Sequence, residues 1–162
     1  MSVFDIDISV NDDVWNNQMT EVEDVTHSVI ETILSAQLPH IEHIEVSVVL
    51  ANDPFISTLN KQYRDKDKPT NVLSFPQTEK HELDSAKDFV CLGDIVVSYE
   101  TIAKEAKEQN KTFANHYTHM LVHSCLHLLH YDHEDDIEAQ DMENLEIKIL
   151  KEMSIKNPYQ SE

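Results

Sequence analysis

The residues of this sequence with the greatest chemical potential are histidines gathered in one short stretch. Six of its ten histidines lie there, and they are His116, His119, His123, His127, His130 and His133. The spacing of His123 and His127 places both imidazoles on one face of a helix, one turn apart, where they can share a metal ion. Histidine is the commonest metal ligand in proteins, and neutral imidazole suits zinc. The stretch therefore predicts a zinc site that includes these two residues.

The third ligand has two candidates, and the spacing leaves both open. If the helix continues, His130 lies on the same face of the helix as His123 and His127. If the helix ends near Leu129 or His130 and the chain turns back, His133 reaches the site instead. The second arrangement matches the three-histidine frame of metzincin peptidases.

Two residues of the metzincin frame are replaced in this sequence. That frame normally has a glycine at the turn and a glutamate, the general base, directly after the first histidine. Here the turn position is His130, and Ser124 follows the first histidine. Histidine tolerates a positive φ better than most residues do. The ligand frame is therefore present, but the base that a peptidase needs is absent.

Other polar side chains flank the predicted ligands. His119 lies one turn upstream of His123 on the same stripe, where it could support the ligands or face solvent. Asp132 and Glu134 flank His133, and carboxylates beside metal-bound imidazoles commonly orient them. These two carboxylates could equally begin the acidic N-terminus of the next helix. We retain His119 and Asp132 as candidate supporting residues of the site.

The only arginine of the chain, Arg64, lies in a basic segment. Four of the twelve Lys and Arg residues fall between Lys61 and Lys68, in a chain whose formal net charge is −19. Such a segment could be a charged, solvated loop. A guanidinium group, however, offers planar bidentate donors that suit phosphate. Arg64 is therefore the candidate catalytic residue for binding a phosphate group.

Composition and charge limit the classes of protein to which this chain can belong. The chain has 162 residues, of which 40% are hydrophobic and 27% charged, and this is typical of one soluble globular domain. A net charge of −19 argues against nonspecific binding of duplex DNA, because that affinity comes largely from Lys and Arg. No apolar run is long enough to span a membrane, and Cys91 and Cys125 form no CxxC motif. The N-terminus is rich in aspartate, unlike a signal peptide, so we expect a cytoplasmic protein.

Apolar periodicity predicts the elements that position these residues. Strands are expected over 4–10, 43–51 and 92–98, and residues 72–75 form a short apolar run before Pro76. Helices are expected over 14–38, as one helix or two, and over 53–63, 99–109, 112–129 and 135–154. Residues 77–89 are polar and predict a mobile loop. The order favours an α+β fold: a single domain over 1–155 with a small mixed β-sheet packed by several helices, then a flexible C-terminal tail over 156–162.

Three blocks of the sequence resemble the YbeY endoribonucleases, a family also described as rRNA maturation factors. The blocks are LNKQYRDKDKPTNVLSFP (59–76), LGDIVVS (92–98) and HMLVHSCLHLLHYDH (119–133). The last block is similar to the family's HGxLHLxGYDH, and the order of the blocks and the chain length also match. Ser124 and His130 stand where the family has glycines.

The resemblance implies a site and a function. The family's three zinc ligands fall on His123, His127 and His133, and its functional arginine falls on Arg64. One zinc ion on three histidines, with a fourth position open for water, is typical of catalytic rather than structural zinc. The implied substrate is single-stranded RNA, with roles in rRNA processing and maturation and in ribosome quality control. The acidic composition favours a ribosome or ribosomal protein with a basic surface as a partner.

Two other functions fit the same frame. A zinc-dependent hydrolase of another substrate, such as a peptide, would share the three histidines, although the missing glutamate counts against it. A non-enzymatic ribosome assembly factor would use zinc for stability alone. It would need a closed four-ligand site, with His130 or His119 as the fourth ligand. An open ligand position would separate these alternatives.

Overall fold

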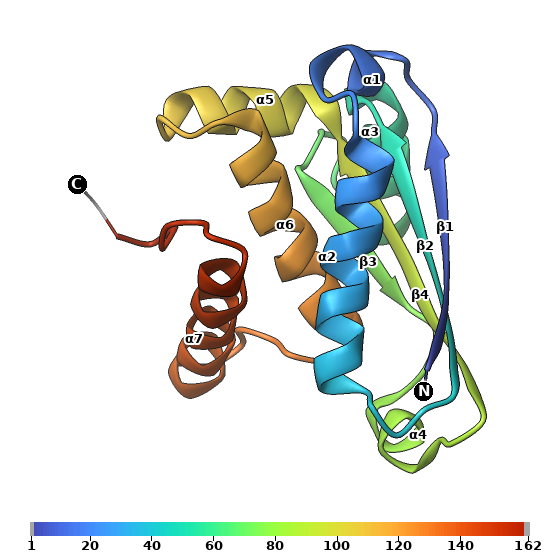
Figure 1. Cartoon of the computed structure of the whole chain (residues 1–162). Helices are drawn as coiled ribbons and strands as arrows, with labels where there is room; N and C mark the ends of the chain where they lie inside the picture. The colour runs from blue at the N-terminus through green and yellow to red at the C-terminus, as the bar shows by residue number, and fades with distance from the viewer. Residues whose placement is uncertain (1, 161–162) are drawn as a thin grey trace.

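Four strands form one mixed sheet in the order β1-β2-β4-β3, seen in a computed structural model that describes residues 2–160 (Figure 1). The strands are β1 (Val3–Val10), β2 (His43–Ala51), β3 (Val72–Pro76) and β4 (Phe89–Ser98). β1, β2 and β4 pair in parallel, whereas β3 pairs antiparallel with β4 and forms an edge of the sheet. The predicted α+β fold with a small mixed sheet is confirmed.

Helices cover both faces of this sheet. Within residues 2–160 they are α1 (Val14–Gln18), α2 (Val22–Gln37), α3 (Asp53–Arg64), α4 (Lys80–Ser85), α5 (Tyr99–Glu108), α6 (Phe113–Leu128) and α7 (Asp136–Glu152). α2 and α6 lie side by side over one face, and α7 packs against α6 on the side away from the sheet (Figure 1). α3 lies against the opposite face. No helix in the described part of the chain is long and apolar enough to cross a membrane.

The alternation of side chains along the strands explains the position of the core. Val48 and Leu50 of β2 are fully buried and join the large apolar core beneath α2 and α6. Ala51 and Val96 point to the other face, where they pack with Ile56 of α3 in a smaller cluster. The two clusters fix α6, which carries the predicted ligands, and α3, which carries Arg64, on opposite faces of one sheet.

Gly93, the only glycine of the chain, allows the edge strand to approach its neighbour. Its φ is 142°, and a β-carbon there would collide with the backbone carbonyl of Phe75 on β3. The register between β2 and β4 shifts between Glu45 and Val46, so β4 carries an irregularity beside this glycine. A glycine at position 93 thus allows β3 to pair closely with β4 at the edge of the sheet.

The structure corrects the expectation of a loop over 77–89. Residues Lys80–Ser85 form α4, and β4 begins at Phe89 rather than at position 92. The side chain of Glu82 accepts a hydrogen bond from the backbone N–H of Glu79 (3.3 Å), and Leu83 is buried in the main core. One apolar anchor in a short polar segment is too weak a pattern to predict a helix. The split of the expected 14–38 helix into α1 and α2 is one of the two arrangements that the sequence allows.

The chain reverses at His130, directly after α6. The helix ends at Leu128, and His130 has a φ of 72°, in the left-handed region. The backbone N–H of Tyr131 donates to the carbonyl of Leu126 (3.0 Å), a bond that commonly closes helices at a left-handed residue. The helix therefore does not continue through position 130, and the turn carries the chain toward His133.

We expect His130→Gly to change the free energy of unfolding little. Glycine removes the strain of a β-carbon in the left-handed region, about 1 kcal/mol. It also removes the hydrogen bond from the ring Nε2–H to the carbonyl of Thr78 (2.6 Å), a loss of about 1 kcal/mol. His130→Ala loses the bond without relieving the backbone, so it should be the less stable variant by about 1 kcal/mol. Urea denaturation of both proteins measures the difference, and equal destabilisation would contradict a strained backbone at this position.

Candidate metal centre

Three histidines of the predicted set converge in the structure. One ring nitrogen from each of His123, His127 and His133 lies within 4.8 Å of the other two. His123 and His127 come from successive turns of α6, and their Nε2 atoms are 3.0 Å apart. His133 comes from the segment after the helix, which the left-handed residue His130 turns back toward α6. The three rings could hold one metal ion.

Hydrogen bonds on the outer ring nitrogens orient the three imidazoles. The acceptors of the Nδ1 protons are Oε2 of Glu146 for His123 (2.8 Å), the carbonyl of Tyr131 for His127 (3.0 Å) and Oδ1 of Asp132 for His133 (3.1 Å). A neutral ring protonated at Nδ1 carries a lone pair on Nε2. Two such lone pairs, 3.0 Å apart on His123 and His127, repel each other unless a cation lies between them. The donor set therefore fits a metal ion, and three imidazoles suit zinc.

The surroundings also favour the neutral form of the rings. Burial lowers the pKa of His127, and the neighbouring imidazoles of His123 and His133 lower it further. A histidine must be neutral to bind a metal. The site thus keeps His127 in its metal-binding form at a lower pH than a free imidazole would allow.

Glu146 of α7 is a buried carboxylate at the centre of this arrangement, and the sequence analysis misses it. It is 1% exposed, and it accepts hydrogen bonds from His123 at Oε2 and from both His119 (2.8 Å) and the hydroxyl of Tyr159 (2.6 Å) at Oε1. Burial alone raises the pKa of Glu146, but the bonds from His119, His123 and Tyr159 outweigh burial and lower it to about 2. An ionised carboxylate therefore faces Nδ1 of His123 and holds the proton on that nitrogen.

The sequence carries one signal for Glu146, which is its position on an apolar stripe. Met142, Ile149 and Leu150 of α7 are buried on the same side of the helix as Glu146. A glutamate in such a stripe needs a polar partner, because an unpaired buried charge is strongly unfavourable. The stripe does not reveal the partner, which lies on another helix.

The two candidate supporting residues contact the group in different ways. His119 lies outside the three-histidine group and shares the carboxylate of Glu146 with His123. Asp132 accepts hydrogen bonds from both the backbone N–H (2.7 Å) and Nδ1 (3.1 Å) of His133. Their supporting role stays a prediction, with these contacts as its basis.

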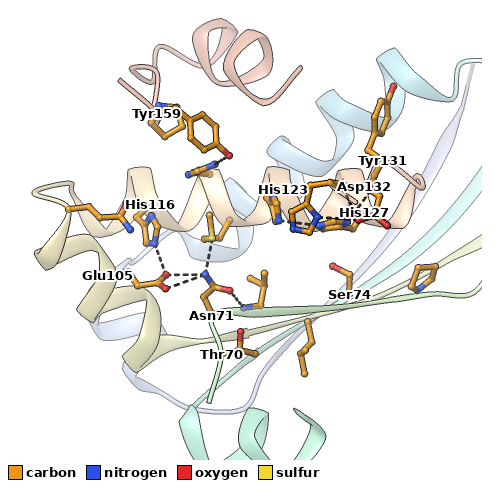
Figure 2. Close-up of a pocket in the computed structure, with 18 of the residues that line it drawn as sticks. Thr70, Asn71, Ser74, Glu105, His116, His123, His127, Tyr131, Asp132 and Tyr159 are labelled. Carbon is orange, nitrogen blue, oxygen red and sulfur yellow. Dashed lines mark hydrogen bonds and ion pairs between the residues drawn. The ribbon is translucent and has the colours of Figure 1, made fainter. Parts of the chain in front are cut away.

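The three rings line a cleft with a volume of about 780 Å³. Figure 2 shows His116, His123 and His127 along α6, with Ser74 of β3 on the facing side. Arg64, in the last turn of α3, also lines the cleft. Its side chain is exposed and makes no hydrogen bond or ion pair within the described residues. The structure thus brings the predicted arginine and the predicted ligands to one cleft.

The C-terminal segment forms another wall of the cleft. Pro158 and Tyr159 line it, and the ring of Tyr159 meets the ring of His119 edge-on, with centroids 5.5 Å apart. Residues 156–160 therefore include direct contacts to the site. The flexibility expected of 156–162 stays a prediction, and its last two residues lie outside the described part of the chain.

Comparison with known proteins identifies the family. Residues 8–154 match the family model described as Endoribonuclease YbeY. The chain belongs to the YbeY family. Relatives named Endoribonuclease YbeY, from Francisella tularensis subsp. novicida and Francisella philomiragia, are 48% and 49% identical to it over 128 residues. These alignments cover 78% of this chain and 78% and 80% of the two relatives.

A solved structure shows the same fold. The solution structure of TM1509 from Thermotoga maritima aligns with a TM-score of 0.54 over 97% of both chains, at 23% sequence identity. The family membership expected from the three sequence blocks is confirmed, and the YbeY match spans Arg64 and all three histidines of the group.

In this YbeY-family chain we expect His133→Ala to lose bound zinc as severely as His123→Ala, because a three-ligand site has no spare donor. His130→Ala should keep the metal, because the ring of His130 bonds to Thr78 and lies outside the group. Zinc analysis of the purified variants measures the stoichiometry. Zinc loss in His130→Ala with retention in His133→Ala would contradict the ligand set.

We also expect Glu146→Gln to weaken zinc binding by about 10- to 100-fold, the usual effect of removing a partner that orients a ligand. A neutral amide holds the Nδ1 proton of His123 less strongly than a carboxylate does. Chelator competition measures the affinity. Glu143→Gln is the matched control, since Glu143 is an exposed residue of the same helix. Equal affinities in the two variants would show that the charge of Glu146 does not support the ligand.

Proposed function

We propose that this chain is a zinc-dependent endoribonuclease that cleaves single-stranded RNA. The observation that carries the proposal is the convergence of three imidazoles in a cleft that the only arginine also lines. Membership of a family described as Endoribonuclease YbeY, and relatives with the same name, support RNA as the substrate.

His123, His127 and His133 would hold one zinc ion, leaving a position open for water. When bound, zinc supplies Lewis acidity to a phosphoryl oxygen of the substrate. The chain contributes orientation: the acceptors on Nδ1, including Glu146 and Asp132, keep the three Nε2 lone pairs directed into the cleft. Because these bonds already exist, little reorganisation is needed during the reaction.

Arg64 would bind the phosphate that is cleaved. A guanidinium can donate two parallel hydrogen bonds to phosphate oxygens, and these strengthen as negative charge builds up in the transition state. The side chain is exposed and has no hydrogen-bonding partner within the described residues, so contact with the substrate breaks no existing bond. Arg64 is therefore the catalytic residue that we assign outside the ligand set.

The structure gives less support to a peptide hydrolase. A metzincin-type peptidase has its general base directly after the first histidine. Ser124 occupies that position, is fully buried and hydrogen bonds to the side chain of Ser74. Position 124 therefore presents neither a carboxylate nor an accessible group to a substrate.

A structural zinc site is supported less well for a different reason. Such a site would need His119 or His130 as its fourth ligand. Nε2 of His119 donates to Glu146 (2.8 Å), and Nε2 of His130 donates to the carbonyl of Thr78 (2.6 Å). Neither ring belongs to the three-histidine group among the described residues, and this favours a site that is open to substrate.

We infer a cytoplasmic role in rRNA processing and maturation and in ribosome quality control, with a ribosome or ribosomal protein as partner. The charge of the chain supports the need for a partner. With a net charge of −19, most of the surface repels RNA. A partner with a basic surface would offset that repulsion and present the RNA to the cleft.

We expect Arg64→Ala to lower kcat/KM for single-stranded RNA by roughly 100-fold or more, the usual effect of removing a group that stabilises transition-state charge. Bound zinc and thermal stability should not change, because Arg64 is exposed and lies outside the three-histidine group. A ribonuclease assay with parallel zinc analysis and thermal unfolding measures all three quantities.

Two controls make this experiment decisive. Lys104→Ala removes an exposed cation of α5 and should cleave RNA normally, since Lys104 does not line the cleft. Chelation of zinc should abolish cleavage in the wild type, and added zinc should restore it. Cleavage that survives chelation would refute the zinc-dependent function, and combined loss of zinc and stability in Arg64→Ala would make Arg64 structural.

A further inference from the structure

Tyr63 lies at the exposed end of the face of α3 that packs against the sheet. Helical spacing places Ile56, Asn60 and Tyr63 on one face of that helix. Ile56 and Asn60 are 0% and 1% exposed, whereas Tyr63 is 59% exposed. The difference arises because β3 is an edge strand, so the sheet ends beneath Tyr63. The ring of Phe75 on β3 meets the tyrosine ring at 65°, with centroids 5.2 Å apart, and this contact orients a ring that is otherwise open to solvent.

This aromatic pair adjoins the cleft. Arg64, the residue after Tyr63, lines the cleft, and so do Ser74 and Pro76, which flank Phe75 on β3. Consecutive side chains of a strand point to opposite faces, and consecutive side chains of a helix diverge by about 100°. The aromatic pair therefore lies on one side of the edge strand and the cleft on the other, and Arg64, which lines the cleft, directly follows Tyr63 in the chain.

The segment around Tyr63 is a basic region of an acidic chain. Residues 61–68 contain four cations and two carboxylates, in a sequence with a net charge of −19. Lys66 and Lys68 are exposed, in a loop that is tied to α3. The side-chain amide of Asn60 donates a hydrogen bond to the backbone carbonyl of Lys68 (2.9 Å). The backbone carbonyl of Asn60 accepts a hydrogen bond from the N–H of Lys66 (3.2 Å). The backbone that carries these lysines is thus fixed next to the exposed tyrosine.

We propose that Tyr63 and Phe75 form a stacking site for one base of an RNA strand whose phosphate is bound by Arg64. Proteins that bind single strands combine cations along the backbone with aromatic rings on which bases stack, and both occur together at this point of the surface. A base in a duplex is already stacked between its neighbours, whereas an unpaired base can present its face. The inference rests on the proposed function for its choice of RNA, and it adds a structural source for single-strand preference.

The first test compares binding of two strands to the zinc-loaded full chain. One is a cleavage-resistant 2′-O-methyl oligoribonucleotide, and the other is a strand of equal length without bases. Tyr63→Ala should weaken binding of the first strand by roughly 10-fold or more, the effect of losing one base-aromatic stack, and leave binding of the second unchanged. Tyr63→Phe should bind both strands like the wild type, because it keeps the ring. Lys66→Ala should weaken both equally, because a lysine acts on the phosphates.

The second test, made at saturating strand, detects contact between a base and position 63 rather than a change in affinity, and it does not use Tyr63→Ala. Trp15 is the only tryptophan of the chain and is fully buried, so Tyr63→Trp adds the only exposed indole. Its fluorescence should be quenched by the strand with bases and not by the strand without them.

The outcomes separate this inference from the proposed function. Equal quenching by both strands, or an equal effect of Tyr63→Ala on both, would overturn the stacking site and would assign the exposed ring to protein contacts or folding. Base-dependent quenching in a chain that does not cleave RNA would support the stacking site while refuting the nuclease. Cleavage of RNA without any base-dependent effect at Tyr63 would leave the nuclease intact and refute the stacking site.

Discussion

The buried carboxylate of Glu146 joins the parts of the chain that build the candidate metal centre. It lies on α7 and accepts hydrogen bonds from His119 and His123 of α6 and from Tyr159 of the C-terminal segment. A charge buried at this depth is tolerated only when hydrogen bonds satisfy it. The packing of α7 on α6, the direction of the His123 ring and the position of the C-terminal segment therefore depend on one another. This network holds a proton on Nδ1 of His123 and so leaves Nε2 as the nitrogen that could bind a metal ion.

The edge strand β3 determines what surrounds that centre. Because the sheet ends at β3, a cleft can open between this strand and α6, and the end of α3 can reach the cleft from the opposite face. Gly93 permits this edge by admitting the backbone of Phe75. The same edge leaves Tyr63 uncovered beside Arg64, in a basic segment of a chain whose net charge is −19. Under the proposed function, this basic segment is the part of the surface that an anionic RNA strand would approach.

The sequence could predict features that repeat locally along the chain. Helical periodicity placed His123 and His127 on one face, and the structure brings their Nε2 atoms to 3.0 Å. Apolar alternation indicated β1, and β-branched residues indicated β2. β4 begins three residues before its expected start, and the edge strand β3 had only a short apolar run as its signal. The three blocks of sequence indicated the family and, through the family's motifs, Arg64 and His133. Each of these inferences depends on residues that are close in sequence or on a motif that is itself continuous.

The packing of the elements on one another sets which distant residues meet. The sequence left His130 and His133 as alternative third ligands, because a left-handed φ at a residue other than glycine has no periodic signature. In the structure, the φ of 72° at His130 reverses the chain and brings His133 to the other two histidines. Glu146 and Tyr159 had no assigned role, because their partners lie on other elements and periodicity describes only one element at a time. Patterns within the sequence were sufficient for the family, the fold class and the pair of histidines that α6 brings to the candidate site. Packing sets the third histidine of the site, the buried carboxylate of Glu146 and the walls of the cleft. It brings together side chains whose separation in sequence carries no information about their distance in space.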